Sequence, residues 1–123
     1  MSARTPFAAI LKRAVESTLH AIGGAFADSE GEMVDSYSTM DAHDWAVLTA
    51  HYGVVLSQLT AAFGTMHFGG PEYFIAQHKS IEVVVHMVED GYFALLACRE
   101  SVPLTTAIEH LRVAAGELRR EMA

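Results

Sequence analysis

Residues 41–64 read DAHDWAVLTAHYGVVLSQLTAAFG, and no Asp, Glu, Lys or Arg stands between Trp45 and Phe63. The pattern predicts a long helix, because its large side chains recur at the helical period of 3.6 residues. These large side chains form one stripe: Trp45, Leu48, Tyr52, Val55, Leu56, Leu59 and Phe63. Small residues form a second stripe, which would let another backbone approach closely: Ala46, Ala50, Gly53, Ser57, Thr60 and Gly64. A surface helix normally keeps one charged face, so we expect this helix to be covered on two sides.

One side of this helix is expected to pack on its own domain and the other side on a second copy of the chain. If pairing buried about 600 Å² of apolar surface, the gain would be on the order of 15 kcal/mol as an upper bound. That gain can exceed an association cost of about 4 to 15 kcal/mol. Burial inside one subunit is one alternative, and a membrane span is another, because this length covers about 30 Å. No span is expected, because polar residues such as His51 and Gln58 interrupt the run and an acidic flank precedes it.

The length of the chain is that of one domain, residues 1–123. It contains eight Lys and Arg against fifteen Asp and Glu, which gives a net charge of -7. This balance disfavours nucleic acid and anionic membrane surfaces as partners, because both attract basic proteins. The single Cys98 excludes an internal disulfide, and its apolar surroundings predict a buried side chain. Charges among the first twenty residues disfavour a signal peptide, so a reducing cytoplasm is the expected location.

Capping and turn residues divide the N-terminal part into a helix and a hairpin. Thr5-Pro6 is typical of a helix start, and an amphipathic pattern follows to residue 22. The pair Gly23-Gly24 is expected to end this helix. Two short strands are then expected over residues 25–27 and 32–37, on either side of turn residues 28–31.

Three further strands and a helix are expected after residue 64. Residues 72–78 predict an edge strand, because both of its ends are polar. Residues 81–88 and 92–98 are apolar without alternation, which places them mid-sheet, and an Asp-Gly hairpin joins them. A loop over residues 99–102 leads to a last helix that Pro103 opens. The result is an α+β sandwich of five antiparallel strands, with the long helix on one face and the N- and C-terminal helices on the other.

Residues that could carry chemistry do not converge in this sequence. None of the seven histidines pairs with another or with Cys98 at a spacing typical of metal ligands, and the strand register is expected to place His86 opposite Tyr73. Gly69-Gly70-Pro71 opens a strand and is not followed by Lys-Ser/Thr, unlike a phosphate-binding loop. No nucleophile has a recognisable catalytic partner. We therefore expect a binding module that is not an enzyme and has no cofactor or metal.

Three motifs in this order resemble the roadblock/dynein light-chain family, and the resemblance covers nearly the whole chain. They are GAFADSEG at residues 24–31, DGYFALL at residues 90–96 and the tail pattern Leu111-x-x-Ala114-x-x-x-Leu118-x-x-Glu121. The resemblance implies a profilin-like sandwich with the element order α-β-β-α-β-β-β-α. It also implies homodimers or heterodimers in which the second helices pack together and the edge strands can join two sheets into one.

The same resemblance implies a function in regulation. Members of the family bind and regulate small Ras-like GTPases or act as adaptors in motor and signalling complexes. The bacterial MglB-like members stimulate GTP hydrolysis by a polarity GTPase without an arginine finger, so neither Arg13 nor Arg99 is expected to be catalytic. A homodimeric GTPase regulator is therefore the expected function, and a scaffold subunit that binds partners independently of nucleotide is the alternative.

The predicted interface residues come from the long helix and the edge strand: Trp45, Leu48, Tyr52, Gly53, Leu56, Tyr73 and Ile75. Which stripe of the long helix faces the partner stays open at this point. The identity of the GTPase, the direction of the effect on hydrolysis and the choice between homodimer and heterodimer stay open as well.

Overall fold

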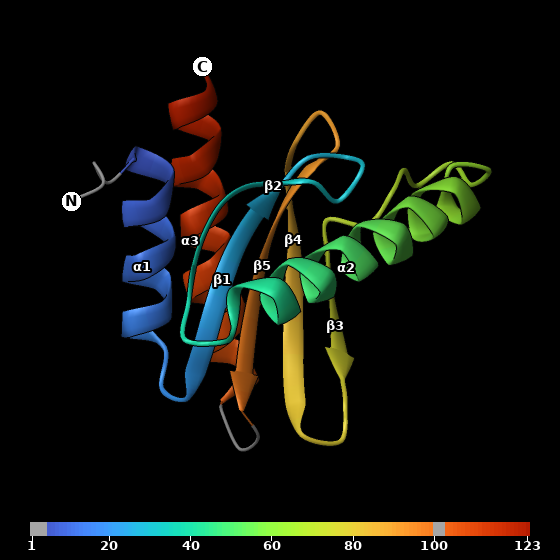
Figure 1. Ribbon diagram of the computed structural model, residues 1–123. Coiled ribbons are helices and arrows are strands. Elements are labelled where there is room, and N and C mark those ends of the chain that lie inside the picture. The colour runs from blue at the N-terminus through green and yellow to red at the C-terminus, as the bar shows by residue number, and fades with distance from the viewer. Residues whose placement is uncertain (1–4, 100–102) are drawn as a thin grey trace.

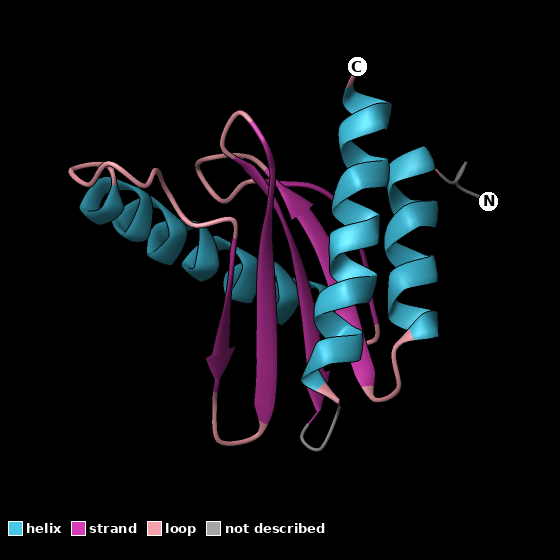
Figure 2. Cartoon of the chain, turned by 180° about the vertical axis from the view of Figure 1, so that it is seen from behind, coloured by secondary structure: helices cyan, strands magenta, loops and turns pink. Residues whose placement is uncertain are grey.

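The computed structural model describes residues 5–99 and 103–123, which form one antiparallel sheet between two helical layers (Figure 1). The strands are β1 (Ala21–Ala27), β2 (Met33–Ser38), β3 (Tyr73–Gln77), β4 (Ile81–Glu89) and β5 (Tyr92–Arg99). Their order across the sheet is β2-β1-β5-β4-β3. Helices α1 (Pro6–Ser17) and α3 (Leu104–Met122) lie side by side on one face, and α2 (Ala42–Phe63) crosses the other (Figure 2). The predicted profilin-like sandwich and its element order are confirmed.

Local capping interactions position the helices where the sequence predicted them. The Thr5 side chain accepts a hydrogen bond of 3.0 Å from the backbone N–H of Ala8, and the Asp41 side chain accepts one of 3.1 Å from the N–H of Asp44. Each bond satisfies an N–H that lacks a partner inside the first turn of its helix. Gly64 is the C-cap of α2, as expected.

The prediction that α1 runs to residue 22 is wrong, because α1 ends at Ser17 and the pair Gly23-Gly24 lies inside β1. His20, at a φ of 67°, turns the chain from the helix into the strand. Close packing on each face of β1 explains why glycine occupies both positions. A Cβ on Gly23 would lie 2.8 Å from the Trp45 ring on one face, and a Cβ on Gly24 would lie 3.3 Å from Val15 on the other. A strand with helices packed this closely on both faces accommodates glycine without breaking.

The predicted sheet positions are correct in the C-terminal half. Strand β3 is an edge strand, β4 and β5 are central, and Tyr73 pairs with His86. Arg99 belongs to β5 and not to a loop, because it pairs with Ile81; the rest of the predicted loop lies outside the described residues. The second strand starts at Met33, one residue later than expected.

Two apolar cores lie on the two faces of the sheet. The first packs α1 and α3 on alternate residues of the strands, including Phe26, Val84 and Leu96. The second packs α2 on the residues between them, including Val85 and Leu95. Alternate residues of β4 and β5 thus enter different cores, which explains why neither strand alternates between apolar and polar residues.

Cys98 is buried in the first core, as expected. Burial, together with the neighbouring Glu82 carboxylate, raises the pKa of the Cys98 thiol to about 11. The thiol is therefore protonated at neutral pH, when it is a poor nucleophile.

Candidate functional site

Helix α2 is docked on the sheet through one narrow face only. Its buried residues are Trp45, Thr49, Tyr52, Gly53 and Leu56. Close packing at Gly53 fixes this orientation, because a Cβ there would lie 2.4 Å from the Cα of Gly31 in the β1–β2 turn. The small residue therefore does let another backbone approach, and that backbone belongs to the same chain.

The opposite face of α2 is apolar and exposed. We call it the outer stripe, and it consists of Val47, His51, Val54, Val55, Gln58 and Ala62. At 3.6 residues per turn these six positions fall within about 100° of the helix circumference, roughly opposite the buried face. Val47 and Val55 are each 39% exposed and Val54 is 55% exposed. None of these six residues is charged, although the chain has a net charge of -7. The exposed Asp44, three residues before Val47, lies within the same arc at the N-terminal end of the helix.

The apolar surface continues past the end of the helix. Figure 1 shows that the C-terminal half of α2 extends beyond the sheet. Phe63 at its end is 36% exposed, and Met66 and Phe68 in the following loop are 52% and 91% exposed. By length and composition, α2 would also be able to cross a membrane. The exposed apolar area is of the kind that marks an interaction site.

A groove of about 550 Å³ runs between α2 and the edge strand β3. Val47, Leu48 and Val55 form its α2 wall together with His51, so the groove is continuous with the outer stripe. Tyr52 and His78 lie in it and are hydrogen bonded through the phenol oxygen and Nε2. Burial raises the pKa of Tyr52 above its ordinary value of 10.0.

The seven residues predicted for the interface occupy different parts of the molecule. Trp45, Tyr52 and Leu56 face the chain's own sheet, Gly53 packs on the β1–β2 turn, and Leu48 is half-buried at the groove. Tyr73 is 48% exposed on β3, where it stacks on His86 with 6.0 Å between ring centroids, and the half-buried Ile75 packs on the first core. Their role in an interface stays a prediction.

Sequence reasoning missed Val47 and Val54, which belong to neither of the two stripes it defined. The spacing indicates that they share one face of the helix, since the steps between Val47, His51, Val54 and Gln58 are four, three and four residues. The burial of Trp45 and Tyr52 on the sheet is what identifies this third set as the free one.

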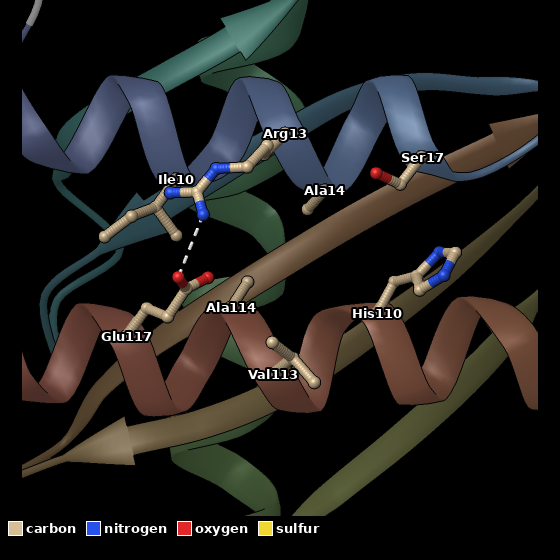
Figure 3. A pocket seen from close by; sticks show the side chains of 8 residues that line it. All are labelled: Ile10, Arg13, Ala14, Ser17, His110, Val113, Ala114 and Glu117. Atoms are coloured by element: carbon tan, nitrogen blue, oxygen red, sulfur yellow. Dashed lines mark hydrogen bonds and ion pairs between the residues drawn. The ribbon is translucent and has the colours of Figure 1, made fainter.

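A second, smaller cavity of about 170 Å³ lies between α1 and α3 (Figure 3). Arg13 spans it and pairs with Glu117 at 2.9 Å, with 61% of the Arg13 side chain exposed. His110 closes the other end, with its Nδ1 2.8 Å from the hydroxyl of Thr18. These contacts join the two helices, and an ion pair this exposed contributes less than about 1 kcal/mol.

The described residues form no cluster of metal-ligating side chains. Across residues 5–99 and 103–123, no three His, Cys, Asp or Glu residues are placed to hold a metal ion. Arg99 is exposed at the end of β5. The surface that distinguishes this molecule is therefore the apolar outer face of α2 with its adjoining groove.

A sandwich in which a single long helix crosses one face of a β2-β1-β5-β4-β3 sheet is the roadblock fold. Neither a protein-family model nor a curated protein sequence matches the chain. Solved structures match over nearly the whole length. The chain is similar to MglB of Myxococcus xanthus, with a TM-score of 0.87, 12% identity and 98% of each chain covered. It is also similar to a roadblock/LC7 domain from Streptomyces avermitilis, with a TM-score of 0.84, 10% identity, and 92% of this chain and 94% of that chain covered.

A third match is a structure of MglB with a tetrameric arrangement, with a TM-score of 0.82 and 16% identity. It covers 91% of this chain and 84% of that one. At these identities the likeness shows the fold, which is the fold that the sequence motifs predicted.

Proposed function

We propose that this chain is an MglB-like roadblock protein that forms a homodimer in the cytoplasm and regulates a small Ras-like GTPase without being an enzyme itself. The paired α2 helices would form the platform that the GTPase contacts. The observation that carries the proposal is the uncharged outer stripe of α2, exposed on a protein whose net charge is -7.

The physical case for pairing rests on the exposed valines of α2. Val47, Val54 and Val55 are 39%, 55% and 39% exposed on one side of one helix. Taking such a side chain from fully exposed to fully buried is worth about 1.5 to 3 kcal/mol, so covering the exposed part of each valine is worth roughly half of that. A two-fold pair buries each valine in both copies. A matching copy is the simplest partner for this surface, because it is equally apolar.

Similarity to other structures supports the choice of partner class. The fold neighbours are roadblock domains and MglB proteins, one of them in a tetrameric arrangement. A protein of this kind acts through contacts with its partner, and the GTPase supplies the catalytic groups.

The homodimer is tested by charging the outer stripe. Val54→Glu should convert the dimer to a monomer, because two carboxylates would be buried in the contact without partners. Val113→Glu is the matched control, since Val113 is 52% exposed on α3, close to the 55% of Val54, and lies far from the outer stripe. Light scattering measures both masses. A Val54→Glu protein that keeps the mass of the control contradicts the proposed contact.

The GTPase is tested separately, by capture from host lysate with a non-hydrolysable GTP analogue or with GDP. A Ras-like GTPase captured mainly with the GTP analogue supports the regulator and supplies the substrate for a hydrolysis assay. The same partners in both nucleotide states, with no GTPase among them, would instead indicate the scaffold subunit. Val54→Glu should lose the captured GTPase if the platform is the paired helices.

A further inference from the structure

We infer that a second groove, between the C-terminal half of α2 and two turns of the sheet, binds a basic, amphipathic helical segment of a protein partner. The turns join β1 to β2 over residues 28–32 and β4 to β5 over residues 90–91. We call this surface the turn groove. The inference goes beyond the proposed function, because it needs neither the homodimer nor a GTPase.

The turn groove has the size and lining of a binding site. Its volume is about 370 Å³. Leu56, Ala61 and Met87 supply an apolar lining. The hydroxyl-bearing residues Ser29, Ser57 and Thr60 line it as well. Sites that hold ligands combine a mostly apolar lining with a few polar groups that orient what binds there.

The turn groove lies on the flank of α2 that faces away from the groove beside β3. Ser57 stands nine residues after Leu48, which is two and a half helical turns, so the two residues point to opposite sides of the helix. The two turns lie side by side, because a Cβ added to Gly91 would be 2.8 Å from the Cβ of Ser29. Figures 1 and 2 both show these turns at the same end of the sheet. A cover on the outer stripe would therefore leave the turn groove accessible.

The rim of the turn groove carries negative charge. The two turns and the residue just before the second contain five carboxylates: Asp28, Glu30, Glu32, Glu89 and Asp90. No Lys or Arg stands in residues 28–32 or 89–91. Neither of the two ion pairs found among residues 5–99 and 103–123 involves these carboxylates.

The basic residue that contacts this end of the sheet approaches from the other face. Arg119 belongs to α3, and its Nε donates a hydrogen bond of 2.9 Å to the carbonyl oxygen of Val88. Helix α3 covers the face of the sheet opposite α2 (Figure 2). Arg119 therefore does not line the turn groove and leaves the charge of its rim in place.

Turn structure accounts for only two of the five carboxylates. Asp28 Oδ1 accepts hydrogen bonds of 2.9 Å and 3.0 Å from the backbone N–H groups of Glu30 and Glu32. Asp90 adopts a φ of 53°, a conformation that Asp tolerates in tight turns. The side chains of Glu30, Glu32 and Glu89 are exposed and take no part in these turn contacts. Their charge is available to attract and orient a basic partner.

The neighbouring strands favour a helix as the bound segment. Strands β4 and β5 are central, and each is paired on both sides. A segment in the turn groove therefore cannot add itself to the sheet through backbone hydrogen bonds. A helix satisfies its own backbone and can place an apolar face on Leu56 and Met87, with Lys or Arg beside the turns. The α2 wall from Leu56 to Ala61 is about 7.5 Å long, so one to two helical turns make the contact and the affinity is that of a transient complex.

A synthetic amphipathic helix of Leu and Lys is the probe that tests this occupant on the full chain. Its fluorescence anisotropy measures binding, and a peptide of the same composition in scrambled order is the reference. The amphipathic peptide should bind about tenfold more tightly than the scrambled one, and both should weaken as salt is raised. Equal binding of the two peptides, or no binding of either at low salt, would overturn the inference.

The position of the site is tested by removing charge from its rim. Glu30→Gln/Glu89→Gln should weaken binding of the amphipathic peptide about tenfold. Glu16→Gln/Glu121→Gln is the matched control, because it removes the same charge from exposed positions on α1 and α3. The control should change the affinity less than about twofold. An equal loss in both double variants would show that net charge alone attracts the peptide, and would overturn the site.

The groove itself is tested by filling it. Ala61→Trp should abolish the preference for the amphipathic peptide, whereas Val113→Trp, at an exposed position on α3, should keep it. Circular dichroism shows that both variants remain folded. An Ala61→Trp protein that binds like wild type would overturn the groove. Spermidine that bound as tightly as the peptide would make the occupant a small cation and overturn the partner class.

Failure of this inference can be told from failure of the proposed homodimer. Val54→Glu should keep its affinity for the amphipathic peptide, because Val54 does not line the turn groove. A monomeric wild-type protein that binds the peptide removes only the homodimer. A dimeric wild-type protein that shows no preference for the amphipathic peptide removes only the turn groove as a site.

Discussion

Gly53→Ala is predicted to destabilise the protein, although Ala is the better helix former. The added Cβ would lie 2.4 Å from the Cα of Gly31 and 2.9 Å from its nitrogen. Ordinary carbon contacts are about 3.5 to 4.0 Å, so the helix or the turn must move by about 1 Å. Both contacts are with backbone atoms, so no side chain can rotate to relieve them.

Two opposing effects determine how much Gly53→Ala changes the free energy of unfolding. Overpacking of this kind costs about 1 to 3 kcal/mol, and the gain in helix propensity returns about 1 kcal/mol. We expect a net loss of up to about 2 kcal/mol. Gly116→Ala is the control, because Gly116 also lies in a helix, α3, where the nearest atom to an added Cβ is 3.8 Å away on the flexible Arg120 side chain. It should stabilise the protein by about 0.5 to 1 kcal/mol.

The assay is urea unfolding of wild type and both variants at one protein concentration, because mass action in a dimer moves the transition. The predicted result is a midpoint below wild type for Gly53→Ala and above wild type for Gly116→Ala. If Gly53→Ala were as stable as Gly116→Ala, α2 would not be docked through Gly53, and the assignment of the outer stripe would lose its basis.

Three further predictions concern single side chains. Tyr52→Phe removes the bond to His78 in the groove and should lower the free energy of unfolding by about 0.5 to 1.5 kcal/mol, measured by urea unfolding; no change would mean that the bond contributes nothing. The thiol of Cys98, with its pKa raised from 9.0 to about 11, contributes stability that is fully present below pH 9 and is lost as the pH rises toward about 11. Cys98→Ala should therefore show a shallower loss of stability over that range in pH-dependent unfolding, and equal slopes would contradict the assignment. Arg99→Ala should keep any stimulation of the partner GTPase in a single-turnover hydrolysis assay, whereas a loss of about 10³-fold or more would make Arg99 an arginine finger.

Local signals made most of the fold predictable from sequence. Caps at Thr5 and Asp41 and the Asp90-Gly91 turn act within a few residues, so their geometry can be inferred without the rest of the chain. The pair Gly23-Gly24 was misleading because its cause is not local. Its place in a strand depends on Trp45 and Val15, which approach from two different helices.

The sequence predicted which helix carries the candidate site, but not which face of that helix is exposed. The uncharged run from Trp45 to Phe63 predicts that α2 is covered on two sides. The chain's own sheet covers one side, and the cover of the exposed outer stripe stays a prediction. Which face is free could not be inferred, since every face of α2 is apolar enough to be buried. The answer depends on Gly31, a turn residue distant in sequence, whose backbone admits only the Gly53 side of the helix.

In the proposed homodimer the outer stripe of α2 is covered by a second copy. Light scattering on the purified wild-type chain at micromolar concentration, beside Val54→Glu, tests this contact. Wild type should have twice the chain mass of 13.4 kDa, and the variant should have the single-chain mass. A wild-type protein that remains at 13.4 kDa would contradict it.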